Sequence, residues 1–245
     1  IVDYQNQKTI IAPSENNTVY AISEEGSIVF EIPFSSRIST SPSVLRLNNM
    51  LVIFIGLNDG SVYGFDLSGN ILYQYFIDGG VVGSVVFSDI NYDLYPDIVV
   101  SSNLGKIYLF NINGQIFQNF PITYEFPNSS SPLVCDIDQD LDLDIIGGSS
   151  NFVYAIDYKQ NGNNDEYWYL YKGNNLRNGY YEFNCNTGDL DQNNVINILD
   201  VISIVNVILD ESNLDDYELC QIDLNGDGNV NVLDVISMTN IILEF

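Results

Sequence analysis

A twelve-residue segment near the C-terminus carries oxygen-bearing side chains at regular intervals. They stand at positions 1, 3, 5, 9 and 12, with a glycine at position 6: Asp223, Asn225, Asp227, Asn231 and Asp234. Carboxylate and amide oxygens at this spacing can wrap one hard cation, and a backbone carbonyl at position 7, here Asn229, completes the set. The segment therefore predicts a calcium-binding loop.

The same segment occurs once more, 34 residues earlier, where residues 189–210 share eleven of 22 positions with residues 223–244. The ligands expected in this first copy are the side chains of Asp189, Asp191, Asn193, Asn197 and Asp200, with the carbonyl of Val195. Asn194 replaces the glycine, and asparagine tolerates the left-handed backbone better than most residues. Two copies in register favour calcium over a solvated acidic turn, so we expect one ion in each.

Two shorter acidic segments lie nearer the N-terminus, at residues 89–97 and 136–144, with acid or amide at positions 1, 3, 5 and 9. With position 7 included, the candidate ligands are Asp89, Asn91, Asp93, Tyr95 and Asp97 in one segment, and Asp136, Asp138, Asp140, Asp142 and Asp144 in the other. Like charges repel at this range, so a tight turn gathers them most readily around a cation. We predict one calcium ion in each, the alternative being a merely acidic hairpin.

These shorter segments belong to a repeat of about 45 residues. Its most regular member is a strand-like run with a central tyrosine, and Tyr20, Tyr63, Tyr108 and Tyr154 are 43, 45 and 46 residues apart. Short β-branched and aromatic runs bounded by Gly, Asn and Asp are typical of strands. Four strands in a repeat of this length are typical of a β-propeller blade, and each acidic segment would join the first two strands of a blade.

About three and a half repeats are visible, and the first lacks an evident opening strand, whereas closed propellers have about four to eight blades. We therefore expect a partial β-propeller over residues 1–158. Residues 159–184 are rich in Asn and Gly and then in aromatics, and we expect a linker that could supply a last outer strand. Its aromatic side chains are expected to cover the end of the sheet array rather than to bind a ligand.

Each C-terminal loop leads into an apolar run of helical length, so residues 185–245 are expected to form a small α domain of two calcium loop–helix units. The overall fold class is then mainly β followed by this α domain. The two runs, within residues 201–209 and 235–243, leave almost no polar face. Packing them together buries one side of each, and the other side must contact a partner or the chain's own propeller.

The paired loops and helical runs of residues 185–245 resemble the dockerin domain. The resemblance implies that this module attaches a secreted protein to a cohesin domain on a scaffold or cell surface, often carrying a polysaccharide-degrading enzyme. The family's recognition positions, 10 and 11 of each loop, fall on Ile198, Leu199, Val232 and Leu233. Cellulosomal dockerins with Ser/Thr recognition are polar at these positions, so this chain is more similar to variants with an apolar face.

The acidic segments at 89–97 and 136–144 give residues 7–158 a resemblance to the FG-GAP/VCBS type of integrin-like β-propeller. The resemblance implies calcium ions that stiffen the loops and a surface suited to adhesion or to carbohydrate. It implies no fixed activity, because a fold does not assign a function.

The amino-acid composition limits the classes of partner and the cellular compartment that we expect. The chain has 33 acidic and 7 basic residues, no histidine, and a formal charge of −26. Such a charge disfavours binding to nucleic acid or an anionic membrane, and the absence of histidine disfavours zinc, haem and His-dependent catalysis. No apolar run reaches the roughly eighteen residues that span a membrane. Calcium loops suit a secreted or cell-surface setting.

Cys185 and Cys220 precede equivalent loops, so we predict a disulfide between them, with free thiols as the alternative.

The leading hypothesis is an extracellular calcium-binding adhesion or docking protein whose propeller is attached through the dockerin-like module to a cohesin-like partner. The alternative is a secreted polysaccharide-active enzyme, a lyase or glycoside hydrolase component, with a missing or unrecognised catalytic part. A third reading makes the C-terminal module a cap on its own propeller. The basic residues form no recognisable grouping, so we assign no catalytic residue: Lys8, Arg37, Arg46, Lys106, Lys159, Lys172 and Arg177.

Overall fold

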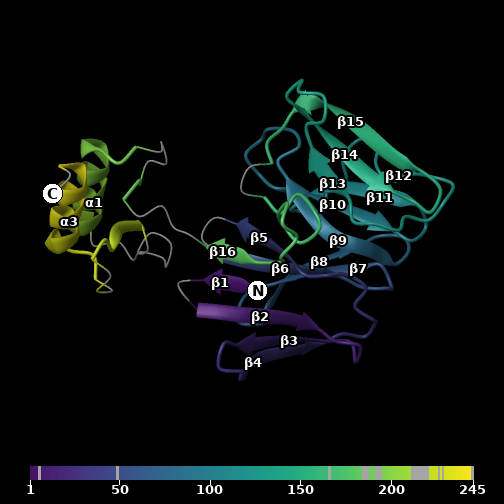
Figure 1. Cartoon of the computed structure of the whole chain (residues 1–245), viewed down its shortest axis with the longest axis horizontal. Coiled ribbons are helices and arrows are strands. Elements are labelled where there is room, and N and C mark those ends of the chain that lie inside the picture. Colours follow the sequence, from purple (N-terminus) through teal and green to yellow (C-terminus); the bar gives the residue numbers. More distant parts are fainter. Residues whose placement is uncertain are drawn as a thin grey trace. The chain divides into compact units, whose positions relative to one another are not determined.

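The computed structural model describes residues 1–4, 7–47, 50–164, 167–183, 188–190, 195–210, 221–225, 227 and 229–243. The chain divides into two compact units, Ile1–Glu182 and Phe183–Phe245. Among the described residues, the first contains four antiparallel β-sheets, and the second contains the helices α1 and α3 (Figure 1). The expectation of a mainly β chain followed by a small α domain is confirmed at this level.

The sheets follow one another along the chain, and neighbouring strands within each are mostly consecutive in sequence. The first sheet has the order β16 (Tyr181–Phe183), β1 (Val2–Tyr4), β2 (Gln7–Pro13), β3 (Thr18–Ser23) and β4 (Ile28–Pro33). The second is β5 (Ser43–Leu47), β6 (Met50–Gly56), β7 (Ser61–Phe65) and β8 (Ile71–Phe76). The third is β12 (Ile122–Thr123), β11 (Lys106–Asn111), β10 (Asp97–Ser102) and β9 (Val81–Ser88), and the fourth is β13 (Leu133–Cys135), β14 (Asp142–Gly148) and β15 (Val153–Asn161).

In the second and third sheets, middle strands are the most buried. All six residues of β10 are buried, as are all but the first of β6, whereas β8 is largely exposed. A strand covered on both faces reads as a continuous apolar run, and a strand at an edge alternates. Strands β6 and β10 therefore lie in sheets that have other sheets on both sides, which explains the apolar runs at residues 51–55 and 98–100.

Successive sheets pack against each other through aromatic side chains. Phe30 and Phe65 join the first and second sheets, with ring centroids 6.0 Å apart, and Phe54 and Phe87 join the second and third at 5.1 Å. Between the third and fourth sheets, nine buried residues form one cluster: Val86, Ile90, Val99, Ile107, Leu109, Val134, Leu143, Ile145 and Tyr154. The core of the first unit is therefore a series of layers between consecutive sheets.

The turn that recurs before each tyrosine-containing strand has a left-handed backbone in three of the four repeats. Asn17, Gly60 and Gly105 hold φ values of 65°, 90° and 73°. A Cβ at Gly60 would lie 2.2 Å from the carbonyl oxygen of Ile77, so no other residue fits there. Asparagine is the residue that best substitutes for glycine in this conformation, which accounts for Asn17.

Two sequence expectations about the ends of the array were wrong. The first repeat does not lack its opening strand, because β1 precedes β2 and pairs with it. Residues 159–182 also give no outer strand to the fourth sheet. Within the described residues β15 is its last strand, and β16 instead joins β1 of the first sheet. Both misreadings come from strands of only three residues, which are too short to show a periodic pattern.

The stretch between β15 and β16 returns to the first strands of the third and fourth sheets. The amides of Phe87 and Val134 donate to the carbonyls of Trp168 and Tyr169, each at 3.0 Å. Asp89 and Asn163 exchange two backbone hydrogen bonds. The side chains of Trp168 and Leu170 are buried, so these residues serve packing, in agreement with the expected structural role of the aromatics.

The second unit is built from α1 (Ile198–Asp210) and α3 (Val232–Ile242). The buried residues Ile204, Ile222 and Met238 form its core, and Ile196 and Val230, at position 8 of the two loops, pack against the same cluster. Among the described residues, no helix has the length and apolar character needed to cross a membrane.

Asn128 provides a test of the packing between the third and fourth sheets. Its buried side chain donates to the carbonyls of Ser102 and Lys106 at 3.2 and 3.1 Å and accepts from the hydroxyl of Tyr154 at 3.0 Å. Asn128→Ala leaves these groups without partners, so we expect it to lower the free energy of unfolding by about 1–3 kcal/mol. Tyr154→Phe, which removes one hydroxyl, should lower it by about 1 kcal/mol.

Urea unfolding followed by fluorescence measures both changes, because Trp168 is the single tryptophan and is buried in this unit. Equal stability of the Asn128 variant and the unmodified chain would contradict the assigned role.

Candidate metal centres

The second C-terminal loop directs its oxygen atoms inward around a compact turn. The amide of Asp227 donates to Asp223 Oδ1 at 3.1 Å and to Asn225 Oδ1 at 2.9 Å, and the amide of Asn229 donates to Asp227 Oδ1 at 2.9 Å. The carboxylate of Asp234 is fully buried and accepts from the amides of Leu224 and Asn231, at 3.0 and 2.8 Å. The structure thus brings the described ligand candidates of this loop onto one turn.

The first C-terminal loop shows the same arrangement where it is described. The buried carboxylate of Asp200 accepts from the amides of Leu190 and Asn197, at 2.9 and 2.8 Å. Asp189 is also buried. The predicted ligands Asp191 and Asn193 lie outside the described residues, as do both cysteines of the predicted disulfide, Cys185 and Cys220.

Positions 9 and 12 of each loop have a second structural role that the sequence analysis missed. Asn231 is the N-cap of α3, where its side chain accepts from the amide of Leu233 and Asp234 accepts from the amide of Asn231. Asn197 and Asp200 repeat these contacts at α1. Such reciprocal capping satisfies amides that a helix start leaves unpaired. The N-x-x-D spacing at the start of both apolar runs was the available signal.

The two shorter loops have nearly identical backbones. Each has positive φ at positions 4 and 6, namely Tyr92 and Leu94 in one loop and Gln139 and Leu141 in the other. In both, the amide at position 6 donates to the aspartate at position 1, and the amide at position 2 donates to the aspartate at position 9. As expected from the sequence, the loops join β9 to β10 and β13 to β14. The corresponding residues of the second sheet, 48–49, lie outside the described residues.

Each shorter loop contains a buried carboxylate oxygen with no hydrogen-bond partner among the described residues. These atoms are Oδ1 of Asp97, a residue that is 0% exposed, and Oδ1 of Asp142, which is 7% exposed. Burial, with smaller contributions from the nearby charges of Asp93 and Asp89, raises the pKa of Asp97 to about 7 against the lowering effect of the hydrogen bond from the Ile90 amide. A buried oxygen without a donor is an unsatisfied acceptor, which a bound cation would satisfy.

The second of these loops holds the densest group of carboxylates. One oxygen from each of Asp138, Asp140 and Asp142 lies within 4.8 Å of the others, and Asp136, Asp138 and Asp144 form a second such group. All of these atoms are oxygens, the donor type that calcium takes at 2.3–2.6 Å. The residues present therefore fit a hard divalent cation after small side-chain movements.

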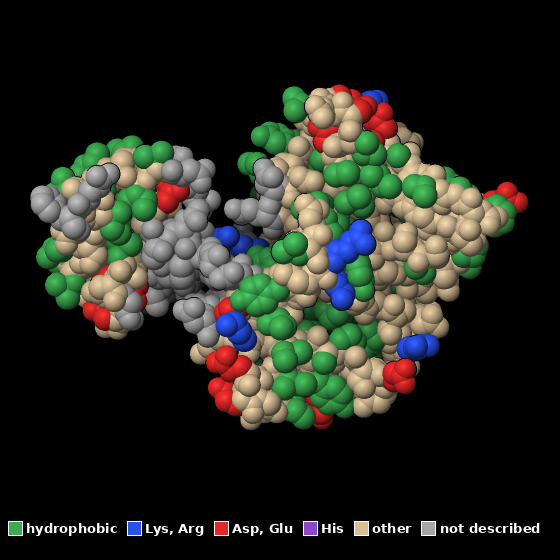
Figure 2. Space-filling view, viewed as in Figure 1, with side chains coloured by type: hydrophobic (Ala, Val, Ile, Leu, Met, Phe, Trp, Pro, Cys, Tyr) green, Lys and Arg blue, Asp and Glu red, His purple; other side chains and the backbone are tan. Residues whose placement is uncertain are grey.

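Lys159 on β15 lies within this group of carboxylates, which the sequence analysis did not foresee. Its ammonium contacts Asp157, Asp140 at 3.4 Å and Asp142 at 3.6 Å. Figure 2 shows acidic side chains gathered around a basic one at the upper end of the β13–β15 sheet. Strand pairing of β14 with β15 brings this lysine beside a loop whose Asp140 lies 19 residues earlier in the sequence.

The predicted partner residues are strongly exposed in both copies. Ile198 and Leu199 at the start of α1 are 63% and 56% exposed, and Val232 and Leu233 at the start of α3 are 63% and 54% exposed. Further apolar residues continue the surface along each helix: Ile202, Val205 and Leu209 on α1, and Ile236 and Ile241 on α3, with Leu243 at its C-cap. Apolar side chains cover much of the visible surface of these helices (Figure 2).

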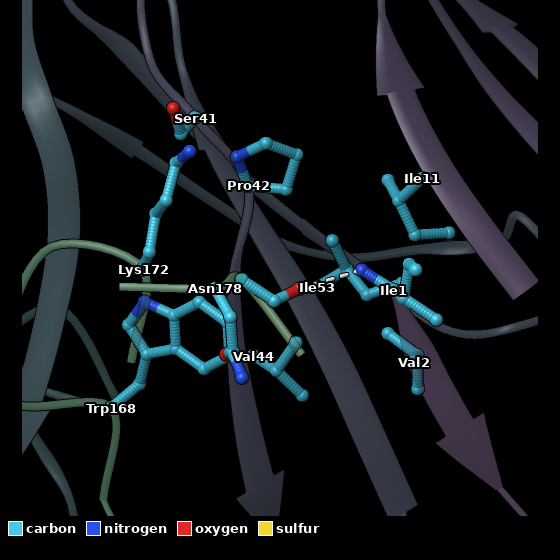
Figure 3. Close-up of a pocket in the computed structure, with 11 residues that line it drawn as sticks. Ile1, Val2, Ile11, Ser41, Pro42, Val44, Ile53, Trp168, Lys172 and Asn178 are labelled. Carbon is cyan, nitrogen blue, oxygen red and sulfur yellow. Dashed lines mark hydrogen bonds between the residues drawn. The ribbon is translucent and has the colours of Figure 1, made fainter. Parts of the chain in front are cut away.

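A small cavity of about 210 Å³ lies in the first unit (Figure 3). The indole of Trp168 and the side chain of Lys172 line it together with Val44, and the amine of Ile1 donates to the carbonyl of Gly179 at its edge. Ligand pockets usually measure about 300–1,000 Å³. None of the described residues that line this cavity is Asp or Glu, so it differs in chemistry from the calcium-type loops.

The pKa of Asp97 gives a test in calcium-free solution. Because the folded-state pKa exceeds the unfolded value, the stabilising contribution is complete below about pH 4 and is lost as the pH rises to about 7. In EDTA, Asp97→Asn should therefore become more stable than the unmodified chain across this range, by about 1–3 kcal/mol at pH 7.

Urea unfolding at several pH values measures this difference. The exposed change Glu125→Gln serves as the control and should produce no such trend. A stability difference for Asp97→Asn that does not grow between pH 4 and pH 7 would contradict the assigned pKa.

Comparison with known proteins finds a family match for the C-terminal unit. Residues 187–243 match the model of the dockerin type I domain. Dockerin domains bind calcium and cohesins and occur in extracellular cellulosome components. The match supports the expectations of a dockerin module and of calcium binding for this part of the chain. A search of curated proteins found no match.

Several solved structures are similar to part of the chain. One is the crystal structure of BBS1N in complex with ARL6DN, soaked with mercury, which is 9% identical, with a TM-score of 0.47 over 63% of this chain and 47% of that chain. The same complex soaked with lead has 10% identity and a TM-score of 0.46. The computationally designed Ika4 protein has 14% identity and a TM-score of 0.46 over 64% of this chain and 88% of that chain. This chain thus spans about half the length of BBS1N.

Proposed function

We propose that this chain is an extracellular calcium-binding docking protein, in which the first unit is displayed through a dockerin domain bound to a cohesin-like partner. The observation that carries the proposal is the duplicated loop–helix unit with one exposed apolar pair on each copy. The match of residues 187–243 to the dockerin type I domain supports the choice of partner. The apolar character of the pairs favours a partner with an apolar surface.

The docking face in this proposal consists of Ile198, Leu199, Val232 and Leu233. Exposed apolar groups on a highly acidic chain are unfavourable unless a partner removes them from water. Two near-equivalent pairs, each at position 10 and 11 of its loop, present the same chemistry at two places. We place them at the centre of the interface, where apolar residues contribute most to affinity.

The first unit is proposed to be part of an FG-GAP/VCBS-like β-propeller that offers a surface for adhesion or for carbohydrate. Its support is the succession of four sheets, the packing of each sheet on the next, and the contacts of β9 with β5, β6 and β13. In this view the sheets are blades, β9 and β13 are inner strands, and the acidic loops lie where blades begin.

The calcium stoichiometry is proposed to be four, with two ions in the dockerin domain and two in loops 89–97 and 136–144. In the dockerin domain the ligands would be Asp189, Asp191, Asn193, Val195, Asn197 and Asp200, and Asp223, Asn225, Asp227, Asn229, Asn231 and Asp234. The fit of the shorter loops rests on their oxygen-only chemistry and on the unpartnered oxygens of Asp97 and Asp142.

The docking face can be tested by placing charges at its two copies. In the full chain, the double variant Ile198→Asp, Val232→Asp should weaken binding to an immobilised cohesin domain by about 30-fold or more, because buried carboxylates would replace apolar contacts. Surface plasmon resonance in millimolar calcium measures the affinity. Val153→Asp is the control, since Val153 is 78% exposed and lies on β15 of the first unit.

The control variant should bind like the unmodified chain. If the double variant keeps its helical circular dichroism and also keeps its affinity, the docking face is wrong.

The stoichiometry can be tested by calorimetric titration of the calcium-free full chain. We expect about four ions per chain in the unmodified protein and one fewer in each of Asp223→Ala and Asp136→Ala, since position 1 is a ligand in every loop. Asp66→Ala is the matched control, because Asp66 supports a turn outside the four loops through the amides of Ser68 and Asn70.

Calcium should also raise the melting temperature of the helical signal, because an ion that binds the folded state stabilises it. A helical melting temperature that is the same in calcium and in EDTA would refute calcium binding by the dockerin domain.

A further inference from the structure

The ammonium group of Lys159 lies beside carboxylates of loop 136–144. It contacts three carboxylates, those of Asp157, Asp140 and Asp142, and Asp140 and Asp142 belong to the triad whose oxygens lie within 4.8 Å of one another. An ammonium and a calcium ion compete for the same carboxylate oxygens. A lysine ammonium is charged at neutral pH, so Lys159 places a positive charge beside these carboxylates.

The other short loop provides a matched comparison within the same chain. Strand pairing places Asp157 opposite Asp144, and it places Asn111 opposite Asp97 in the third sheet. Beyond these partners β15 continues to Lys159, whereas β11 ends at Asn111 and the chain turns at residues 112 and 113. Loop 89–97 therefore has the same backbone turn, and the residues that follow its strand partner, 112–114, carry no charge.

Lys159 leaves the loop incompletely satisfied. Oδ1 of Asp142 is buried and has no hydrogen-bond partner among the described residues, although Oδ2 of the same carboxylate contacts the ammonium. The lysine side chain is 67% exposed, so it can move into solvent without disturbing the core. The loop thus has an acceptor that the lysine does not use and a resident cation that can leave.

We propose that Lys159 is a built-in counter-cation of loop 136–144, which neutralises the loop when calcium is absent and is displaced when calcium binds. The inference rests on the proposed calcium site of this loop. It makes the two short loops unequal: loop 136–144 keeps its shape at low calcium but binds the ion against a competitor, whereas loop 89–97 binds it without one. Displacement of Lys159 would distinguish the calcium-free state of loop 136–144 from its calcium-bound state.

The test is a calcium titration of the isotope-labelled full chain followed by NMR at the amides of Leu94 and Leu141. These amides donate to the position-1 aspartates of their loops and occupy equivalent places. Lys159→Gln should lower the calcium midpoint at Leu141 by about fivefold, the effect of one exposed ion pair. The midpoint at Leu94 should not change, and Lys159→Arg, which keeps the charge, should behave like the unmodified chain.

Thermal unfolding separates this role from simple stabilisation of the fold. Lys159→Gln should melt below the unmodified chain in EDTA, and the difference should vanish or reverse in saturating calcium. Lys106→Gln is the control, because Lys106 pairs with Asp78 at 2.7 Å outside both loops and should lower the melting temperature equally in both conditions.

The titration distinguishes failure of the counter-cation role from failure of the proposed calcium site. A saturable shift at Leu141 with the same midpoint in the unmodified chain and in Lys159→Gln overturns the counter-cation role and leaves the calcium site standing. The absence of any saturable shift at Leu141 in both proteins overturns the proposed site and the counter-cation role together. A melting difference of equal size in EDTA and in calcium assigns Lys159 a purely structural role.

Discussion

All four acidic loops depend on one interaction, in which the last aspartate of the loop accepts a hydrogen bond from the amide at position 2. Asp97 and Asp144 close the short loops in this way, and Asp200 and Asp234 close the longer ones. The contact turns a carboxylate inward and fixes where the loop begins relative to the strand or helix that follows. A buried carboxylate is unfavourable without a nearby positive charge. The contact that shapes each loop therefore also favours the binding of a cation there.

The buried carboxylates are stabilised differently in the two units. In the dockerin domain the final aspartates also cap α1 and α3, so each carboxylate is satisfied by two amides and by the positive end of a helix. In the first unit the loops lead into strands, which carry no comparable dipole. There Asp97 is left with a raised pKa, and the loop of the fourth sheet has Lys159 as a neighbour. The local secondary structure therefore decides which groups stabilise the carboxylates of each loop.

The sequence predicted most of what depends on periodicity. The repeat of tyrosine strands located β3, β7, β11 and β15, and the loop spacing located both pairs of acidic turns. What it could not predict depends on contacts between distant residues. The pairing of β16 with β1, the return of Trp168 to β9 and of Tyr169 to β13, and the approach of Lys159 to Asp140 leave no local pattern. Short strands and single ion pairs are set by tertiary packing, which no window of residues contains.

The pairing of β16 with β1 has a mechanical consequence. If the C-terminal unit is held by a partner while the first unit is pulled by what it binds, tension enters the first unit through β16. The strand that receives the load is then β1, at the opposite end of the sequence from the point of attachment. Backbone hydrogen bonds between these two three-residue strands, together with the contact of Tyr181 with the carbonyl of Ile1, would be the first to bear the force. The fourth sheet, which contains neither β16 nor β1, would lie outside this direct path.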